Sequence, residues 1–274
     1  MPEFRQSGAA MGSISGLLDF LESKGRAAAT ARLLLSVAFV LVVWEAVASV
    51  VESRLLIVPP LEVAQALSEE SASGALWTNA VATIGAVAIS FPIAALIGIS
   101  VGLALASSRF LALTAGPLLT ALNSVPVIAL APLFIAWLGL GFASKFVIVT
   151  IFSMFPILVT TEVGLRATDR HLVEAARSFN ASYWQIFRTV TLPFALPFII
   201  SGIRVGWARA LVAIIVAEFF GAFAGFGFAI LAAGQSFDTA VLLAYVILLG
   251  ILGLSGSLFF EWLERRLAPW RQDQ

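Results

Sequence analysis

The side chains that could carry out chemistry are few in this 274-residue chain. It contains a single histidine, His171, and no cysteine. Thiolate metal sites and structural disulfides are therefore excluded, and haem ligation has little support. The carboxylates are not clustered, so they cannot form a constellation of nucleophile, base and oxyanion donors. We predict that the chain has no metal site and no catalytic residue, and that it is not an enzyme.

The elements that must position the remaining polar side chains are membrane-spanning helices. Hydrophobic residues make up 60% of the chain and charged residues only 12%, whereas a soluble domain carries about 25% charged residues. Several apolar runs reach the ~20 residues that cross a hydrocarbon core of about 30 Å. We predict an all-α polytopic membrane protein with about six transmembrane helices. Their expected ranges are 31–51, 77–106, 111–137, 145–166, 195–219 and 240–262.

The segments outside these spans divide the chain further. Residues 1–30 hold too many charges for a secretory signal, so we predict a cytoplasmic tail with an amphipathic helix at 14–24. A short interfacial helix is expected at 61–67, after two prolines. Residues 218–240 are too rich in glycine to cross, and we expect them to dip into the outer face. The transmembrane domain is then 31–264, followed by a cytoplasmic tail at 265–274.

The basic residues indicate the orientation in the membrane. With the N-terminus inside, twelve of the sixteen lysines and arginines fall on the cytoplasmic side, and only Arg54 and Lys145 fall outside. Cytoplasmic loops carry an excess of lysine and arginine. We therefore place both termini in the cytoplasm. The other two arginines, Arg204 and Arg209, lie inside the fifth span.

Arg209 is the deepest of these charges. It lies ~18 Å along the helix from Pro197, at ~1.5 Å per residue, near the middle of the bilayer. A charge there costs at least about 2.5–3.5 kcal/mol and must face a partner or water. Arg204 and Arg209 could attract an anionic substrate, or Arg204 could reach the cytoplasmic surface or pair with a carboxylate. Three carboxylates could neutralise an arginine or take part in transport: Glu45, Glu162 and Glu218.

The third span contains the best candidates for lining a pathway. Pro126 and Pro132 free backbone carbonyls that lipid cannot satisfy, so the break should face protein or a water-filled cavity. Asn123 and Ser124 lie beside them. The alternative is a kink that only aids packing. The full set of predicted pathway residues is Asn123, Ser124, Pro126, Arg204, Arg209 and Glu218.

Two runs of small residues predict where helices approach closely. Ala94, Gly98 and Gly102 recur every four residues in the second span, and Gly202 and Gly206 do so in the fifth. Small residues at this spacing let helix backbones pack together in a membrane. We see no internal repeat, so an inverted-repeat transporter within one chain is not supported.

The stretch HLVEAARSFNASYWQIFRTVTLPFALP, residues 171–197, is polar where the spans around it are apolar. Asp169 can cap a first helix, and Ser182 with Gln185 can form the capping box of a second. Asn180 lies between them, and a tight corner needs a residue at positive φ, which asparagine tolerates best after glycine. We predict a helical hairpin at about 168–193.

The prolines at 193 and 197 are expected to end the second hairpin helix and to lead stiffly into the fifth span. On periodicity alone, an equally good interpretation is a loop whose helices lie on anionic lipid, held there by Arg170, Arg177 and Arg188.

Specific residues within the hairpin favour a different interpretation. Glu174, Ala175 and Ala176, then a turn residue at Asn180, then Leu192 and Pro193 resemble the EAA signature of ATP-binding-cassette (ABC) importer permeases. These are the inner membrane components of binding-protein-dependent transport systems. The family has glycine where this chain has Asn180, and asparagine is the substitution that a positive φ permits.

The resemblance covers nearly the whole chain after residue 30. NSVPVIALAPLFIAWLGLGFASK, residues 123–145, is similar to the third span of the sulfonate, taurine and nitrate permeases. VPPLEVAQAL, VVWEAV, LRATDRHLVEAARS and LERRL look like the same subgroup. No phosphate-binding loop of the G-x-x-x-x-G-K-[ST] type occurs. ATP and Mg²⁺ must therefore be bound by a partner, and the chain itself needs no cofactor.

The resemblance implies a type I ABC importer permease fold whose hairpin is the coupling helix. It implies a cytosolic ABC ATPase dimer, an extracytoplasmic solute-binding protein and a second permease copy as partners, in a bacterial inner membrane and without nucleic acid. The expected function is import of a small anion, such as an aliphatic sulfonate, taurine or nitrate, by alternating access. The alternatives are a secondary carrier or channel without an ATPase and, with less support, a membrane enzyme.

Overall fold

The computed structural model describes residues 26–51 and 53–268, and the chain divides into two compact units, residues 1–65 and 66–274. The predicted amphipathic helix at 14–24 and residues 269–274 of the predicted C-terminal tail lie outside the described residues. Within the described part of the chain, five helices are long and apolar enough to cross a membrane. The predicted all-α polytopic class is therefore confirmed.

The first unit contains the first long apolar helix, α2 (Arg26–Val50), and the beginning of α3 (Pro60–Ser73). Most side chains of α2 are exposed and aliphatic, as expected for a helix that faces lipid. The Trp44 indole donates a hydrogen bond to the Val58 carbonyl over 2.9 Å, which ties α2 to the loop that follows. The helix predicted at 61–67 is present as α3, which is longer than expected.

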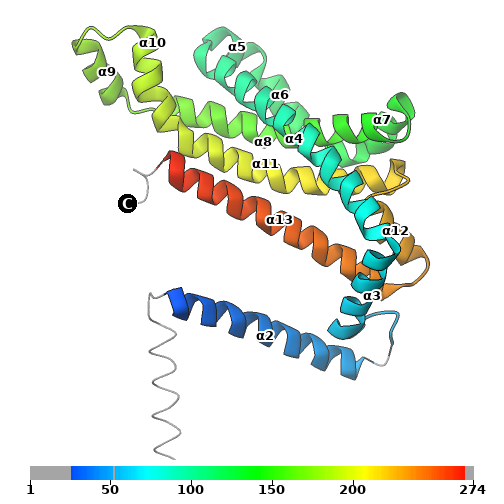
Figure 1. Ribbon diagram of the computed structural model, residues 1–274. Helices are drawn as coiled ribbons and strands as arrows, with labels where there is room; N and C mark the ends of the chain where they lie inside the picture. The colour runs from blue at the N-terminus through cyan, green and yellow to red at the C-terminus, as the bar shows by residue number, and fades with distance from the viewer. Residues whose placement is uncertain (1–25, 52, 269–274) are drawn as a thin grey trace, which may run out of the picture. The chain divides into compact units, whose positions relative to one another are not determined.

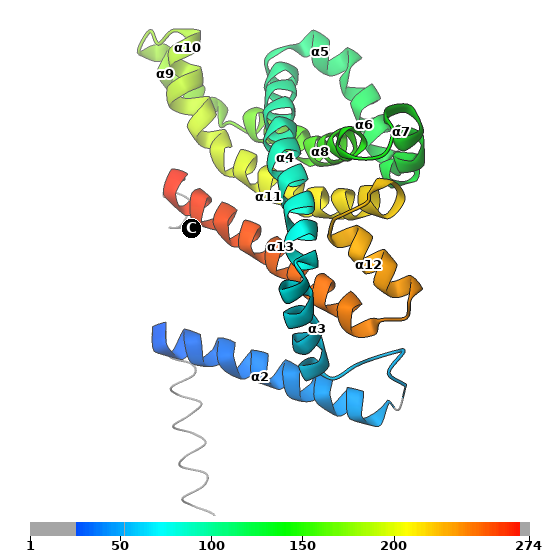
Figure 2. The same ribbon diagram turned by 45° about the vertical axis from the view of Figure 1, so that its right-hand side comes forward.

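The second unit is built on three long helices that pack side by side: α4 (Ala75–Ser107), α8 (Phe142–Arg166) and α11 (Leu192–Gly221) (Figures 1 and 2). Their shared core contains Val87, Ile148 and Ile214, all nearly fully buried. A fifth long helix, α13 (Thr239–Leu267), packs against α11 and against the ten-residue α12 (Phe226–Gln235).

Glycines set the spacing of these helices, as the small-residue runs predict. A Cβ added to Gly98 would lie 2.7 Å from the Met154 carbonyl oxygen of α8, and one added to Gly102 would lie 2.7 Å from that of Leu158. On α11, a Cβ at Gly206 would lie 2.8 Å from the Ile157 side chain. These distances are far below ordinary contact, so the helix backbones approach as closely as only glycine permits.

The third predicted span, 111–137, is not one continuous helix. It is broken into α5 (Arg109–Thr114), α6 (Gly116–Ser124), the 3-10 turn η2 (Val127–Leu130) and α7 (Ala131–Leu138). Pro117, Pro126 and Pro132 explain the breaks, because each lacks the amide that an uninterrupted helix needs. The sequence predicted either a break at Pro126 and Pro132 or a kink that only aids packing, within one span, whereas the segment is divided into several short helices.

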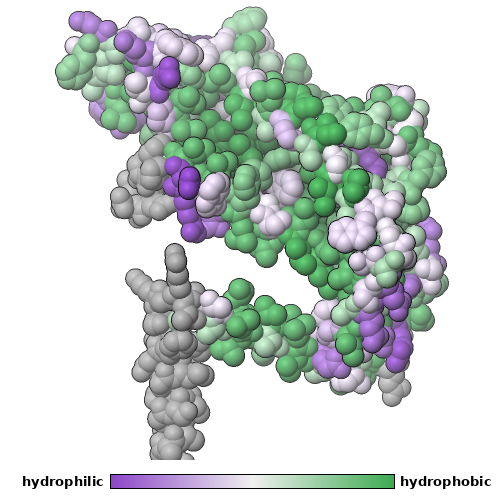
Figure 3. Space-filling model, viewed as in Figure 1, coloured by the Kyte–Doolittle hydropathy of each residue, from purple (hydrophilic) through white to green (hydrophobic). Residues whose placement is uncertain are grey.

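The segment after α11 does not cross, in agreement with the prediction. The ten residues of α12 span only ~15 Å at 1.5 Å per residue, about half of a hydrocarbon core. Hydrophobic side chains cover the visible flank of the second unit, while hydrophilic ones gather on α9 (Arg170–Ser178) and α10 (Tyr183–Ile186) (Figure 3).

Candidate functional site

The predicted hairpin is present, and its caps are the predicted ones. The Asp169 carboxylate accepts a hydrogen bond from the backbone amide of His171 over 2.8 Å, which starts α9. The hydroxyl of Ser182 accepts from the amide of Gln185, whose side chain accepts from the Ser182 amide over 2.7 Å. This is the capping box that starts α10. The two short helices are therefore specified locally by their own sequence.

Asn180 forms the corner between these helices in a left-handed conformation, with φ of 57°. Its amide donates to the Arg177 carbonyl over 2.9 Å, and the Ala181 amide donates to the Ala176 carbonyl over 3.2 Å. These bonds satisfy carbonyls that the end of α9 leaves open. The prediction of a positive φ at Asn180 is confirmed.

The prediction that prolines end the second hairpin helix is wrong. α10 passes through a π-helical turn, η3 (Phe187–Thr191), directly into α11, so that one helical segment runs from Tyr183 to Gly221. The Leu192 amide donates to the Phe187 carbonyl, five residues back. Pro193 falls in the first turn of α11, where a missing amide is tolerated. The π-helical turn thus lets the helix continue past the proline.

The hairpin presents large apolar side chains to solvent. Phe179 is 85% exposed, Tyr183 72% and Trp184 65%, and the Trp184 ring stacks on Phe187 with ring centroids 5.3 Å apart. Exposed aromatic groups that lie close together on an otherwise polar element are typical of contact surfaces. We call Phe179, Tyr183 and Trp184 the hairpin tip.

The EAA residues lie on the same hairpin. Glu174 and Ala175 are exposed on α9, and Ala176 is half-buried. Leu192 packs against the buried Leu165, Ala195 and Ile199 at the root of the hairpin, and Pro193 is half-buried beside it. The signature therefore combines exposed groups on the first helix with groups that anchor the second.

A cavity of about 450 Å³ brings together three of the predicted pathway residues, Asn123, Pro126 and Arg209. They come from the broken third segment and from α11, and α8 supplies further lining residues. The remaining lining residues are apolar except for one hydroxyl: Val125, Phe152, Phe155, Pro156, Val159, Thr160 and Val205. Residues far apart in the sequence thus form one largely apolar chamber with one cation.

Among the described residues that line this cavity, Arg209 is the only charged one, and no ion pair joins it to another residue of the described chain. The Thr160 hydroxyl donates to the Pro156 carbonyl over 2.8 Å, so it is occupied within its own helix. The guanidinium and the Asn123 amide are left as the groups that a solute could meet. Arg209 provides five N–H donors that suit an anion.

The other predicted pathway residues lie elsewhere or are only partly described. Arg204 points to α13, where its guanidinium lies 4.0 Å from a Glu264 carboxylate oxygen. Glu218 is buried away from the cavity. Ser124 ends α6, and its side chain is not among those described. Glu162 pairs with Arg166 over 3.0 Å, which agrees with the neutralising role considered for it.

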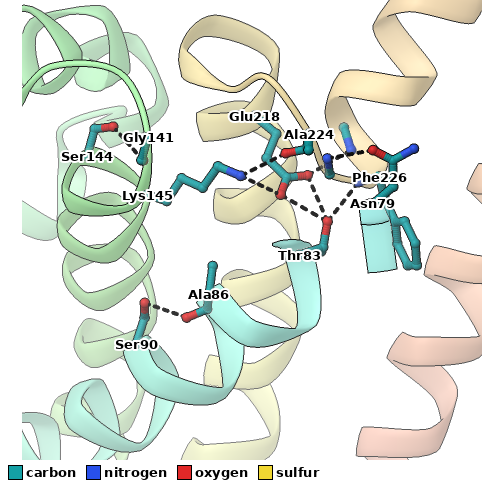
Figure 4. A network of polar contacts seen from close by, with 12 residues as sticks. Asn79, Thr83, Ala86, Ser90, Gly141, Ser144, Lys145, Glu218, Ala224 and Phe226 are labelled. Atoms are coloured by element: carbon teal, nitrogen blue, oxygen red, sulfur yellow. Dashed lines mark hydrogen bonds and ion pairs between the residues drawn. The ribbon is translucent and has the colours of Figure 1, made fainter. Parts of the chain in front are cut away.

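A buried network around Glu218 is the feature that sequence reasoning missed (Figure 4). The ammonium of Lys145 lies 3.1 Å from the Glu218 carboxylate and also donates to the Ala224 carbonyl over 3.0 Å. Thr83 donates to the same carboxylate over 2.9 Å, and the Gly227 amide does so over 2.8 Å. The sequence carries one signal for this pair: opposite charges at the adjacent ends of consecutive antiparallel spans.

This network also holds the loop between α11 and α12. The Phe226 amide donates to the Thr83 hydroxyl over 2.7 Å, and the Gly225 amide donates to the Asn79 side chain over 2.9 Å. Asn79 in turn donates to the Tyr245 hydroxyl, which donates to Glu70 over 2.6 Å. A chain of side chains from α3, α4, α8, α11 and α13 thus surrounds one short loop.

The comparisons with known proteins agree with this architecture. The family model of the binding-protein-dependent transport system inner membrane component matches residues 94–269. The riboflavin transport system permease protein RibX of Chloroflexus aurantiacus is 34% identical over 231 residues, covering 84% of this chain and 86% of RibX.

Two further relatives carry names of the predicted subgroup. The putative aliphatic sulfonates transport permease protein SsuC of Bacillus subtilis is 31% identical over 239 residues, covering 87% of each chain. The taurine transport system permease protein TauC of Escherichia coli is 30% identical over 241 residues, covering 86% of this chain and 88% of TauC. The resemblance to sulfonate and taurine permeases is therefore confirmed.

Among solved structures, the chain resembles a subunit of the MetNI methionine ABC transporter in an inward-facing conformation. The TM-score is 0.61 at 22% sequence identity, and the match covers 70% of this chain and 97% of that one. This likeness confirms the type I importer permease fold. Together, the matched family model, the relatives and the fold show that the chain belongs to the binding-protein-dependent transport system inner membrane components, the permeases of ABC importers.

Proposed function

We propose that this chain is the membrane-spanning subunit of an ATP-driven importer that passes a small organic anion into the cytoplasm by alternating access. An extracytoplasmic binding protein delivers the solute, and a cytosolic ATPase dimer binds ATP and Mg²⁺. One hairpin serves one ATPase protomer, so two copies of the chain pair about a two-fold axis. The excess of basic residues on the hairpin supports an orientation in which this end, and both termini, lie on the cytoplasmic side of the inner membrane.

The observation that carries the proposal is the continuous helical segment from Tyr183 to Gly221. Its first turn belongs to the hairpin tip, and Arg209 projects from its middle into the cavity. A displacement that a docked ATPase imposes on the hairpin is therefore applied to the same helix that lines the solute cavity. The hairpin residues Glu174, Ala175, Ala176, Asn180, Leu192 and Pro193 form the coupling element.

The cavity favours an anion with an organic body. Arg209 supplies a positive charge, while the aromatic and aliphatic side chains around it suit a carbon skeleton better than a bare inorganic ion. Aliphatic sulfonates combine both properties, and SsuC and TauC carry names of that class. RibX is named for riboflavin, a larger and uncharged solute, so charge is the property that an experiment should test.

The test is uptake into liposomes by the tagged chain, purified together with the ATPase and binding protein that accompany it from its native membrane. Ethanesulfonate, taurine, nitrate and riboflavin serve as probes. We expect Arg209→Gln to lower sulfonate uptake by about tenfold or more, since a charge-assisted hydrogen bond contributes ~1.5–3 kcal/mol.

Arg204→Gln is the matched control, because Arg204 lies on the same helix but faces Glu264 instead of the cavity. We expect it to retain most of the uptake. Equal losses in the two variants, or preferred uptake of riboflavin that Arg209→Gln leaves intact, would show that the solute does not meet Arg209 as an anion. Failure of the wild-type chain to bring down an ATPase would refute the importer assignment.

A further inference from the structure

The buried network binds four consecutive residues, the last two of the loop between α11 and α12 and the first two of α12. The Ala224 carbonyl accepts from Lys145, and the amides of residues 225, 226 and 227 donate to Asn79, Thr83 and Glu218. The Glu218 side chain has no exposed surface and that of Lys145 is 7% exposed. No other part of the described chain surrounds a buried charge pair in this way.

Stability alone does not explain a buried charge pair. Desolvation of two ions offsets much of their attraction, and apolar residues of similar volume often stabilise a fold equally well or better. The glycines beside Glu218 strengthen this point. A Cβ on Gly225, where φ is 136°, would lie 2.1 Å from the carboxylate, and one on Gly227 would lie 2.8 Å from the Glu218 Cβ. The loop fits closely around this one carboxylate, so the network fixes the position of the loop and of the start of α12 relative to α11.

The network lies at the far ends of the two helices that carry the hairpin. α8 ends at Arg166, just before the hairpin begins, and the hairpin's second helix continues into α11. The hairpin is therefore continuous in the chain with α8 on one side and α11 on the other. The opposite ends of these two helices are joined by the Lys145–Glu218 pair and by the Gly141 amide, which donates to the Gly221 carbonyl over 3.0 Å.

Between their two ends, α8 and α11 are in close contact. A Cβ on Gly202 would lie 3.3 Å from the Ile157 Cα, and one on Gly164 would lie 2.5 Å from the Phe198 side chain. Pro156 in α8 and Pro197 in α11 each remove a helical hydrogen bond in the same stretch. The two helices are thus in close contact in the stretch where each lacks a backbone hydrogen bond, and we expect them to move as one body.

We propose that Lys145 and Glu218 are positioning residues that pass the movement of the hairpin to the loop 222–225 and α12. α12 and its loop then form the moving element at the outer side. Thr83 extends the connection to α4. This inference rests on the proposed function, since it concerns how an ATPase bound at the hairpin controls the face that meets the binding protein.

The test compares the complete wild-type complex, reconstituted in liposomes, with variants of the network. Lys145→Met with Glu218→Met removes both charges and keeps side chains of similar length. We expect this double variant to retain basal ATPase activity, while the factor by which loaded binding protein stimulates the ATPase falls by about fivefold or more, the lower end of ordinary coupling between sites. A merely structural pair would change the amount of folded protein but not this factor.

The matched control is Glu261→Gln with Arg265→Gln, which removes an exposed ion pair on α13. We expect it to leave stimulation unchanged. If the double methionine variant does not accumulate, Thr83→Val decides the question, because it removes the hydroxyl that joins Phe226 to Glu218 and keeps the charge pair.

The outcomes separate the two claims. Stimulation equal to wild type in the double methionine variant, or in Thr83→Val where that variant decides, would overturn the positioning role. Absence of ATP-driven uptake by the wild-type complex would overturn the proposed function, and this inference with it. Loss of stimulation in the network variants, together with normal stimulation in the α13 control, would support both.

Discussion

Gly98→Ala should show how strongly the three-helix core depends on glycine. The new Cβ would lie 2.7 Å from the Met154 carbonyl oxygen and 2.9 Å from the Ile157 Cβ, whereas unstrained heavy-atom contacts lie at about 3.5–4.0 Å. One partner is backbone, so no side-chain rotation relieves the clash, and α4 must move away from α8. Overpacking of this kind typically costs ~1–3 kcal/mol.

Gly85→Ala is the matched control on the same helix. A Cβ at Gly85 meets nothing within 4 Å, and both substitutions gain the same helix propensity, about 1 kcal/mol. The propensity therefore cancels between the two variants. We expect Gly98→Ala to be less stable than Gly85→Ala by ~1–3 kcal/mol, the overpacking term alone.

The assay measures the midpoint of thermal unfolding of the two purified variants in the same detergent, with size-exclusion chromatography as the readout of folded protein. Gly98→Ala should unfold several degrees below Gly85→Ala, at about 2–4 °C for each kcal/mol in a chain of this size. A midpoint for Gly98→Ala equal to or above that of Gly85→Ala would refute the close approach of α4 and α8 on which the packing argument depends.

Two further predictions concern the hairpin. Asn180→Gly should leave folding and uptake unchanged or slightly improved, because glycine adopts the observed φ of 57° freely. Asn180→Val should destabilise the corner by ~1–2 kcal/mol. Limited proteolysis of the hairpin measures both effects, and equal protection of the two variants would contradict the left-handed corner. Glu174→Ala should leave the chain inserted but uncouple ATP hydrolysis from uptake, while Glu69→Ala, which removes an exposed carboxylate outside the hairpin, should not; normal uptake per ATP in Glu174→Ala would refute the coupling role.

Local features of the chain were predictable from the sequence because their causes are local. Five of the six predicted spans are continuous helices, since apolar runs of this length must satisfy their backbone groups internally in lipid. The caps at Asp169 and Ser182 and the left-handed Asn180 depend on neighbours within four residues. The glycine spacing at Gly98 and Gly102 likewise predicted a packing face, although not which helix it meets.

Other features could not be predicted from the sequence. The prolines of the third span were visible, but not its division into separate short helices, and neither was the π-helical turn through which the second hairpin helix continues past Pro193. The sequence placed both Glu218 and Arg209 among the candidate pathway residues, as charges within one apolar helix. Only the packing of α4, α8 and α11 separates them: Lys145 and Thr83 enclose the first, and the cavity leaves the second open. A charge within an apolar helix takes its role from the groups that lie within a few ångströms, and in this chain many of those neighbours are far away in the sequence.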